Sequence, residues 1–550
     1  MGANGTSVAV VGGGVGGLSA AHELVERGFD VAVYEAGDRF GGKARSIPIS
    51  DADRPLHGEH GFRFFPAFYR HVTATMARIP YRDRTVADNL VPTDETLLAR
   101  TAGEERTSST RTPTSIRGWL DSLRPPVAAE LDRAELRFFT ERLLVLLTSC
   151  DRRREEQWDA VSWWDFIDAD GRSDAYRRYL AGGTQPLVAI RPQLASARTV
   201  GLVYAQLVAG QLDPRQPAER VLNGPSSEVW IDPWVDSLAA AGADLHTNAR
   251  ATEVAADGRR VTGVTVETPA GRQTVEADHY VLAVPVEAVP SLLSPALERA
   301  APSLAGVRDL ETAWMNGIQF YLAEDVPLTG GHGIYVDSPW ALTSISQQQF
   351  WSAFDVSARR PGVEGVLSVI VSDWETPGLD QEKPARECTR EEIAAEVWTQ
   401  LKAHLNRETE RLTDDLLVDW FLDPAIVETG DGVENRAPLL VNTVGSLAHR
   451  PAAATEAPNL ALAADYVRTN ADLASMESAN EAGRRAANAV IERSGATADP
   501  AAVWELPEPA VFEPLRRQDA IRYRLGLPHP GEVSRSLQAW VRDLRPGSPG

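Results

Sequence analysis

The stretch VVGGGVGGL, residues 10–18, places five glycines in nine positions near the start of the 550-residue chain. The apolar residues 8–11 lead into it and suit a buried parallel strand. Apolar residues at helical spacing follow, and the next apolar run, DVAVYEA, ends near Glu35. This order of strand, glycine turn, helix, strand and acidic residue predicts a dinucleotide-binding βαβ unit.

The residues of this unit have separate tasks. Gly12 permits a tight turn, Gly14 lets a pyrophosphate approach the backbone, and Gly17 allows close packing of helix on strand. The free N–H groups at the helix N-terminus attract phosphates, and a carboxylate after the second strand accepts hydrogen bonds from ribose hydroxyls. The expected cofactor-binding residues here are Gly12, Gly14, Val15, Gly16, Gly17, Glu35 and Ala36.

The composition is that of an acidic globular protein, with a formal net charge of -22. Such a charge disfavours a nucleic-acid partner, because binding a phosphate backbone needs a basic face. The length exceeds what one core supports, which predicts two domains. No apolar run approaches the roughly 18 to 20 residues of a spanning helix. The N-terminus has no basic region followed by an apolar segment, so we expect a cytoplasmic protein.

The stretch HGEHGFRFFPAFYRH, residues 57–71, holds three histidines and five aromatic residues. Its spacing does not match a set of metal ligands, and the two cysteines, Cys150 and Cys388, form no cluster, so we expect no metal site. The aromatic residues either pack in the core or line a substrate channel. Both interpretations stay open.

The residues after Glu35 indicate which dinucleotide is bound. The stretch AGDRFGGKARS, residues 36–46, resembles the extended FAD fingerprint of the amine oxidase and phytoene desaturase superfamily. The resemblance implies cofactor contacts at Gly41, Gly42 and Lys43. The family usually has Arg where this chain has Lys43, and Arg45 could also serve.

The far end of the chain agrees. Residues 459–490 resemble the C-terminal flavin motif of the same superfamily, with Ala464-Asp465 where the family commonly has Gly-Asp. The resemblance implies that Asp465 faces the phosphate and ribityl side of the flavin. It also implies that the backbone at Met476 and Glu477 offers a helix N-terminus to the flavin O2 region. The part of this motif that reads SMESAN contains no Cys or His that could bond covalently to the flavin, so we expect noncovalent FAD.

Two further contacts follow from the resemblance. In the family a strand like ATEVAA contacts the adenine, which implies a contact at Val254. The segment after the second strand passes under the flavin ring in the family, which implies contacts at Gly61 and Phe62.

The predicted fold is α/β. Alternating residues in 243–285, with turn residues between them, predict a β-meander. We expect a Rossmann-like FAD-binding domain, a parallel sheet with this β-meander, and an inserted α+β substrate domain. The FAD-binding domain takes residues 1–90, 223–299 and 431–495, the substrate domain takes 91–222 and 300–430, and residues 496–550 form a C-terminal wrap with a short helix.

Three uses of the flavin remain open. The first is a desaturase-type or dehydrogenase-type oxidoreductase that moves hydride between an apolar, isoprenoid substrate and flavin N5. It is favoured because residues 61–81 resemble bacterial carotene-desaturase-like and hydroxysqualene-dehydroxylase-like flavoproteins. The second is an amine or amino-acid oxidase; many such proteins place a lysine near N5, where this chain has Asn316. The third is a redox-neutral isomerase or a noncatalytic flavoprotein.

The partners follow from the first use. We expect an apolar small-molecule substrate and a peripheral membrane contact through which it is reached. The sequence assigns no catalytic residue, no electron acceptor and no oligomeric state.

Overall fold

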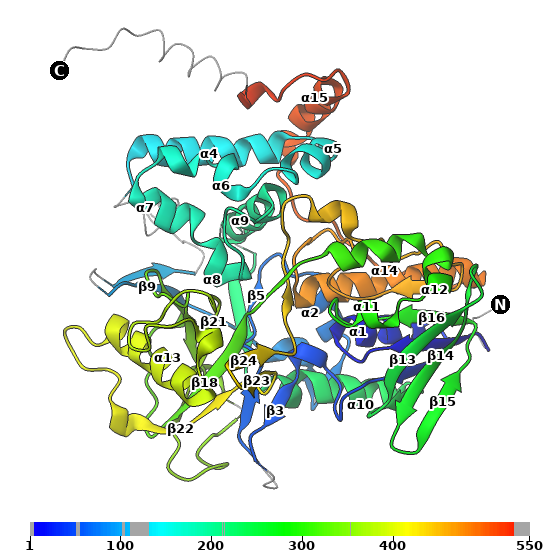
Figure 1. Cartoon of the computed structure of the whole chain (residues 1–550), viewed down its shortest axis with the longest axis horizontal. Coiled ribbons are helices and arrows are strands. Elements are labelled where there is room, and N and C mark those ends of the chain that lie inside the picture. Colours follow the sequence, from blue (N-terminus) through cyan, green and yellow to red (C-terminus); the bar gives the residue numbers. More distant parts are fainter. Residues whose placement is uncertain are drawn as a thin grey trace.

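The computed structural model describes residues 5–50, 55–101, 105–110, 131–211, 213, 215–352 and 354–532. One of its two main sheets has five strands, all parallel, in the order β12-β2-β1-β16-β26. This sheet belongs to the region on the right of Figure 1. Its strands are β1 (Ser7–Val11), β2 (Asp30–Tyr34), β12 (Asp244–His246), β16 (His279–Leu282) and β26 (Leu460–Leu462).

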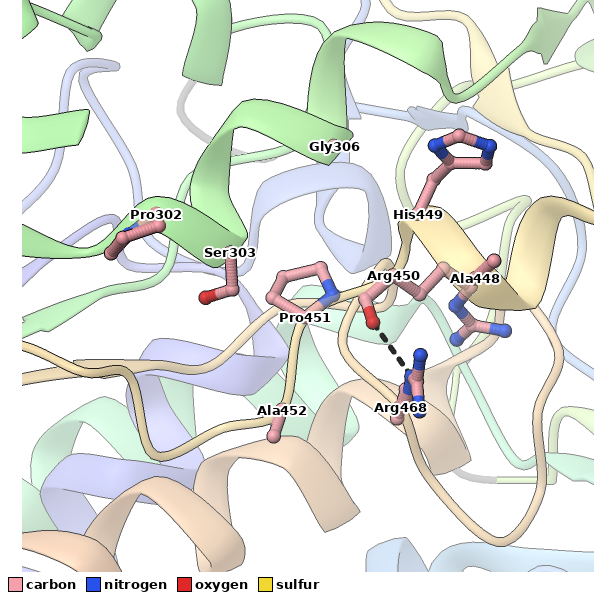
Figure 2. Close-up of a pocket in the computed structure, with 9 residues that line it drawn as sticks. All are labelled: Pro302, Ser303, Gly306, Ala448, His449, Arg450, Pro451, Ala452 and Arg468. Atoms are coloured by element: carbon pink, nitrogen blue, oxygen red, sulfur yellow. Dashed lines mark hydrogen bonds between the residues drawn. The ribbon is translucent and has the colours of Figure 1, made fainter. Parts of the chain in front are cut away.

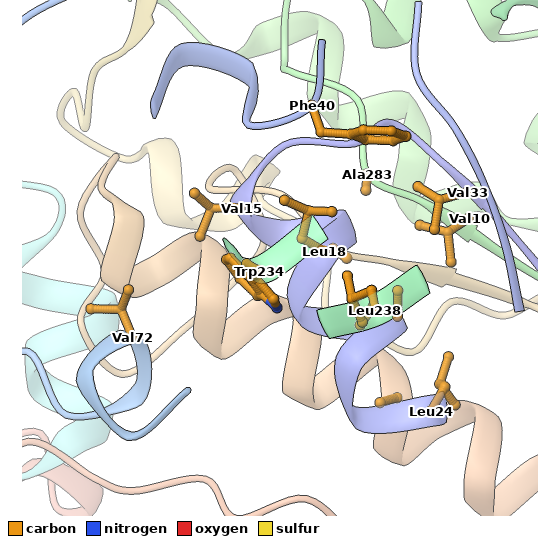
Figure 3. Close-up of a cluster of buried hydrophobic side chains, with 14 of the residues drawn as sticks. Val10, Val15, Leu18, Leu24, Val33, Phe40, Val72, Trp234, Leu238 and Ala283 are labelled. Carbon is orange, nitrogen blue, oxygen red and sulfur yellow. The ribbon is translucent and has the colours of Figure 1, made fainter. Parts of the chain in front are cut away.

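Both faces of this sheet are buried, as the unbroken apolar run in β1 predicts. Val8 and Val10 join the core cluster that contains α1 (Val15–Val25), and Ala9 and Val11 join a second cluster on the opposite face. The alternation follows from the two-residue period of a strand. Figure 3 shows the first cluster, in which Trp234 and Leu238 pack beside α1. These two residues come from α10 (Asp232–Ala240), and α14 (Met476–Ser494) also contributes to this cluster.

The predicted β-meander is confirmed. It consists of β13 (Arg250–Ala256), β14 (Val261–Thr268) and β15 (Gly271–Val275), which pair antiparallel. Its apolar residues pack in the second cluster with Ala9 and Val11, so the meander covers the face of the sheet opposite α1.

The second main sheet has seven strands in the order β10-β9-β19-β20-β21-β18-β22. Only the β9–β19 pair is parallel among these neighbours. The helix α13 (Arg390–Leu405) packs on the sheet and begins with a capping box formed by Thr389 and Glu392. The strands are β9 (Glu95–Ala99), β10 (Arg106–Ser109), β18 (Asn316–Leu322), β19 (Gly331–Tyr335), β20 (Thr343–Ser346), β21 (Gly365–Val371) and β22 (Leu417–Leu422).

A helical region lies above this sheet in Figure 1. Trp163 is fully buried in its core. After an irregular stretch, α15 (Glu513–Arg524) packs against α4 and α5; residues 533–550 of the predicted wrap lie outside the described residues. The main helices are α4 (Arg133–Thr148), α5 (Asp151–Arg153), α6 (Trp163–Phe166), α7 (Asp174–Tyr176), α8 (Thr184–Val188) and α9 (Ala197–Gln211).

The strands of the two main sheets lie in separate ranges of the chain, whereas smaller sheets such as β17-β25 join both. The parallel strands lie in 1–90, 223–299 and 431–495, and the seven-stranded sheet lies in 91–222 and 300–430. We keep the residue boundaries of the two domains as a proposal. In the part of the chain that the structure describes, no helix combines the length and apolar character needed to cross a membrane.

Candidate functional site

The glycine turn, residues 12–17, connects β1 to α1. Gly12 has φ +107°, a conformation that L side chains rarely adopt. A Cβ on Gly16 would lie 1.8 Å from the Ala463 carbonyl oxygen, at the end of β26. The backbone of α1 therefore touches the backbone after β26, and glycine is required at this contact.

Gly14 differs from these two glycines. A Cβ there would meet only the Gly42 Cα, at 3.9 Å, so the packing of the protein does not require glycine. The first hydrogen bond of α1 runs from the Leu18 N–H to the Gly14 carbonyl, at 2.9 Å. The N–H groups of Val15, Gly16 and Gly17 precede it and have no intrahelical acceptor. An open space beside free N–H donors fits a pyrophosphate.

Glu35 follows β2 and lies against this turn. Its carboxylate accepts hydrogen bonds from the Gly13 N–H at 2.8 Å and the Gly37 N–H at 2.7 Å. A carboxylate has about four acceptor positions, so lone pairs remain for ribose hydroxyls. A Cβ on Gly37 would lie 3.4 Å from Arg45 Nη1 and 3.1 Å from Glu35 Oε1, which places the Arg45 guanidinium near this carboxylate. Ala36 is partly exposed beside it.

The second glycine pair joins the same turn. The Gly41 N–H donates to the Gly13 carbonyl at 2.8 Å, and Gly41 has φ +105°. A Cβ on Gly42 would lie 3.1 Å from the Gly14 Cα, so the two glycine segments are in close contact.

Lys43 follows this pair, but its side chain contacts other parts of the chain. Its Nζ lies 3.2 Å from Glu287 Oε1 and donates a hydrogen bond to the Pro438 carbonyl. The predicted contact of Lys43 with the cofactor stays a prediction.

The C-terminal motif also presents free polar groups. Asp465 lies just after β26, at the carboxyl edge of the parallel sheet, where ligands of such sheets bind. Its side chain has no hydrogen-bond partner among the described residues. The first helical hydrogen bond of α14 runs from the Ala479 N–H to the Ser475 carbonyl at 3.0 Å. Among the described residues the N–H groups of Met476 and Glu477 have no acceptor, so they could bind an anionic group, as the resemblance implies.

The Glu477 side chain has a task that the sequence did not reveal. It is buried and accepts hydrogen bonds from the N–H groups of Arg70 at 2.8 Å, His71 at 2.8 Å and Val72 at 3.0 Å. It also contacts the ring Nδ1 of His71 at 2.7 Å. This carboxylate therefore holds the N-terminus of α2 (His71–Met76) against α14. The partners are more than 400 residues apart, so no local pattern predicts the contact.

The remaining predicted residues lie in two places. Val254 is buried in β13, with its side chain in the core beneath the parallel sheet. Gly61 follows β4 (His57–Glu59), and a Cβ there would lie 3.3 Å from Ile370 Cδ1 of β21. The Phe62 ring lies 4.9 Å from the His332 ring in β19. Gly61 and Phe62 are thus at the seven-stranded sheet, and their contact with the cofactor stays a prediction.

The five aromatic residues of 57–71 divide into two groups. Phe65, Phe68 and Tyr69 pack in the core cluster around α1, and burial raises the pKa of the Tyr69 hydroxyl well above its usual range. Phe62 and Phe64 are partly exposed, and both contact the His332 ring. The core interpretation is therefore correct for three residues, and the other two remain candidates for a substrate channel.

A group of polar side chains lies where β4 meets the seven-stranded sheet. Asn316 Nδ2 donates to Asp423 Oδ2 at 2.7 Å, the His60 Nδ1 contacts the same oxygen, and Asn435 Nδ2 donates to Asn316 Oδ1 at 2.7 Å. Asp423 follows β22, and Asn435 ends β24 (Gly432–Asn435). We call these four residues the junction cluster. The sequence predicted none of these contacts.

The electrostatics of Asp423 are unusual. Burial disfavours its charged form, but the His60 ring, the Ala425 N–H and the Asn316 amide outweigh this and lower the pKa of Asp423 to about 2. The carboxylate is therefore ionised at neutral pH although only 2% of the residue is exposed.

A surface pocket between residues 302–306 and 448–452 lies beside the C-terminal motif (Figure 2). Its buried cation, Arg450, is already engaged. The Arg450 guanidinium donates to the carbonyls of Asp465 at 2.9 Å and Val467 at 2.7 Å and pairs with Asp472. Arg450 therefore fixes the loop that carries Asp465, and the pocket has no free buried charge in the part of the chain described.

These features define a two-sheet α/β protein whose glycine turn has open space and backbone donors that fit a dinucleotide. Residues 15–491 match the family model for flavin containing amine oxidoreductase, and the chain belongs to this family. It is an FAD-dependent oxidoreductase.

The chain is similar along nearly its whole length to two cyanobacterial proteins. It is 26% identical to "Probable zeta-carotene desaturase" of Synechococcus elongatus, over 88% of this chain and 98% of that protein. It is 23% identical to "Zeta-carotene desaturase" of Synechocystis sp., over 88% of this chain and 97% of that protein. Among solved structures, putrescine oxidase shares the fold with a TM-score of 0.61 and 17% identity, covering 88% of this chain and 99% of that chain.

Proposed function

We propose that this FAD-dependent oxidoreductase is of the desaturase or dehydrogenase type and acts on an apolar, isoprenoid substrate. The observation that carries the proposal is the similarity to two zeta-carotene desaturases over 97% or more of their lengths. The likeness to putrescine oxidase is one of fold. The similarity to "Tryptophan 2-monooxygenase" of Agrobacterium vitis covers 11% of this chain.

The lysines give independent support against the amine oxidase alternative. The chain has three lysines, and each has a carboxylate partner: Lys43 with Glu287, Lys383 with Glu392, and Lys402 with Asp414. At the start of β18, where the resemblance to amine oxidases places a lysine, Asn316 is fully buried and hydrogen-bonded on both sides of its amide.

FAD, when bound, supplies the hydride acceptor of the reaction. We propose that it is held noncovalently, by the glycine turn and Glu35 at the adenosine end and by Asp465 and the N-terminus of α14 at the flavin end. The free N–H groups and open space at these positions fit the cofactor. Phe62 and Phe64 would contribute apolar surface for the substrate next to the seven-stranded sheet.

An anaerobic flavin-reduction screen tests the function. The purified yellow protein is mixed with carotenoids, other terpenoids, amines and amino acids, and the loss of the visible flavin absorbance is followed. We expect bleaching by an isoprenoid and none by amines or amino acids. Bleaching by an amine or amino acid alone would establish the oxidase alternative. Turnover of substrate only by the photoreduced protein, with no reoxidation of its flavin, would establish the redox-neutral alternative.

We also propose that the substrate is reached at an anionic membrane surface through α15. This helix packs at the outer end of the helical region in Figure 1. It exposes apolar side chains together with Arg517 and Arg524, although the whole chain is strongly acidic. A basic helix with an exposed apolar face is typical of peripheral membrane contacts. The exposed apolar residues of this segment are Val511, Leu515, Ile521, Leu525 and Leu527.

Vesicle co-sedimentation checks this contact. We expect binding to vesicles of phosphatidylglycerol and phosphatidylcholine, and weaker binding after the double substitution Ile521→Ser and Leu525→Ser. The matched control, Leu379→Ser, changes an exposed leucine elsewhere and should bind like the wild type. Equal binding by all three proteins would contradict the proposal.

A further inference from the structure

His60 is the one histidine of the junction cluster, and its two ring nitrogens have different surroundings. Nδ1 contacts Asp423 Oδ2. Because Asp423 is ionised and can only accept, Nδ1 must carry the proton. The neutral ring then has an unprotonated Nε2 with a lone pair. Nε2 has no hydrogen-bond partner among the residues that the structure describes, and 14% of the side chain is exposed.

Two other buried histidines differ from His60, whereas His332 resembles it: its Nδ1 contacts Glu219, and its Nε2 has no hydrogen-bond partner among the described residues. The His71 ring contacts Glu477 through Nδ1 and accepts from the Trp504 N–H at 2.9 Å through Nε2. The His404 ring contacts the Gln400 carbonyl through Nδ1 and Asp337 through Nε2, at 3.0 Å. Both rings use both nitrogens within the protein. His60 keeps one nitrogen for a ligand.

The position of His60 connects the two halves of the site. Its carbonyl accepts from the Gly317 N–H at 2.6 Å, and a Cβ on Gly317 would lie within 2.9 Å of the backbone of residues 59–61. The start of β18 is therefore in close backbone contact with residues 59–61. On the other side, Arg63 Nη2 donates to the Lys43 carbonyl at 2.7 Å, next to the Gly41–Gly42 pair. His60 thus lies between the glycine segments and the seven-stranded sheet.

Three other charged groups lie near the pair. The Arg63 Nε lies 3.7 Å from Glu59 Oε2, and Arg390 Nη1 donates to the Asp423 backbone carbonyl at 3.1 Å. Burial lowers the pKa of Arg63, while Glu59 and Asp423 oppose this shift. The Asp423 carboxylate is the group in direct contact with the ring, so it stabilises the imidazolium if Nε2 takes up a proton.

We propose that His60 is the proton acceptor of the dehydrogenation and that Asp423 is its positioning residue. The inference rests on the proposed function, in which a CH–CH unit of the substrate becomes a C=C bond. One C–H bond breaks with its electron pair, and this hydride passes to FAD, which is thereby reduced by two electrons. The neighbouring C–H bond loses its proton to Nε2 of His60, and the electron pair left behind forms the second bond between the carbons. The imidazolium then releases the proton to solvent through its exposed edge.

The first test needs no substrate and no turnover. In FAD-loaded protein with ring-labelled histidine, long-range proton–nitrogen NMR shows which ring nitrogen carries the proton, and His60→Gln assigns the signal. In the neutral form of the ring we expect protonated Nδ1 and unprotonated Nε2 in the wild type, and loss of this preference in Asp423→Asn. The control Asp337→Asn, which alters the pair with His404, should leave the His60 signals unchanged. A His60 ring protonated at Nε2 in the wild type would overturn the inference.

The second test measures the chemical step. In anaerobic stopped-flow experiments with the isoprenoid found by the screen, we expect His60→Gln to slow flavin reduction by about 10²- to 10⁴-fold, the usual range for loss of a general base. The substrate Kd and the FAD content should stay as in the wild type. The wild-type rate should depend on pH through this ring, and His60→Gln should lack this dependence. The control His404→Gln should reduce its flavin at the wild-type rate.

The two failures are distinguishable. If no isoprenoid reduces the flavin, the proposed function is wrong. If an isoprenoid reduces the flavin of His60→Gln as fast as that of the wild type, the function stands and the role of His60 is wrong.

Discussion

The glycine turn and the junction cluster use different parts of the chain for their chemistry. The turn offers backbone N–H groups of residues 15–17 and contains no charged side chain. The junction cluster consists of four polar side chains from four separate segments. A site made of backbone donors depends on small residues and close packing, whereas a site made of side chains depends on protonation. Substitutions in the turn should therefore act by steric overlap, and substitutions in the cluster should act by changing charge.

The largest effect should come from Gly16→Ala. The new Cβ would lie 1.8 Å from the Ala463 carbonyl oxygen, and backbone on both sides prevents either partner from moving freely. Overpacking of this kind costs about 1 to 3 kcal/mol or more, and we expect a value of at least about 3 kcal/mol here. Urea unfolding of the apo-protein measures it.

Gly14→Ala is the matched control for the turn. Its Cβ meets only the Gly42 Cα at 3.9 Å, so the free energy of unfolding of the apo-protein should change by no more than about 1 kcal/mol, the cost of alanine at this helix cap. FAD affinity should still fall, because the methyl group fills the space for the pyrophosphate. Equal loss of stability in both variants would show that the turn is not open at Gly14.

Glu35→Ala should have the next largest effect. In the proposed cofactor site the substitution removes a charged acceptor for ribose hydroxyls, and it should weaken FAD binding by roughly one to two orders of magnitude, or about 1.5 to 3 kcal/mol. Titration of the apo-protein with FAD gives the Kd. Glu35→Gln keeps one oxygen acceptor for the Gly13 N–H and should lose less. An FAD occupancy that survives dialysis unchanged in Glu35→Ala would show that the ribose is held elsewhere.

Asp423→Asn should change how stability depends on pH. The pKa of Asp423 is about 2 in the folded protein, below the usual value of about 3.9 for an unfolded chain. A lowered pKa stabilises the fold above the unfolded value, and the stabilisation is lost as the pH falls through the folded value. It amounts to about 2.6 kcal/mol, and about half is lost by pH 3.

Urea unfolding at pH 5, 4 and 3 checks this expectation. The gap in free energy of unfolding between wild type and Asp423→Asn should shrink by about 1 kcal/mol over this range. A gap that is constant from pH 5 to pH 3 would mean that the carboxylate is not stabilised by His60 and its other partners.

The two regions also differ in how far the sequence predicts them. The glycine turn and Glu35 lie within one continuous stretch of 24 residues, from 12 to 35, so their spacing in the sequence predicts how they are arranged in space. The junction cluster joins His60 to Asp423 across 363 positions and Asn316 to Asp423 across 107. Spacing in the sequence does not predict contacts between such distant residues, because these contacts depend on how β4, β18 and β22 pack.

The three histidines of residues 57–71 illustrate the same limit. In the sequence they are equivalent members of an aromatic stretch. In the structure His71 holds Glu477, His60 holds Asp423, and burial next to Arg359 lowers the pKa of His57 to about 4. The strands β18 and β21 and the helix α13 were predictable because each carries its own apolar pattern. The partner of a buried histidine is set by segments elsewhere in the chain.

Lys43→Ala should have the smallest effect. It tests whether a side-chain charge contributes to cofactor binding at the glycine segments. Lys43 belongs to the glycine segments by sequence, and the resemblance nominates it for the cofactor, but its Nζ contacts Glu287 and the Pro438 carbonyl. A partly exposed ion pair of this kind contributes about 0 to 1 kcal/mol. We therefore expect a decrease of less than about 1 kcal/mol in the free energy of unfolding, and an FAD Kd within about threefold of the wild type, since 1.4 kcal/mol corresponds to tenfold. Lys43→Arg, which keeps the charge, should restore the stability. If Lys43→Ala instead weakened FAD binding as much as Glu35→Ala, the lysine would act on the cofactor, and side-chain charge would contribute to the glycine region as well.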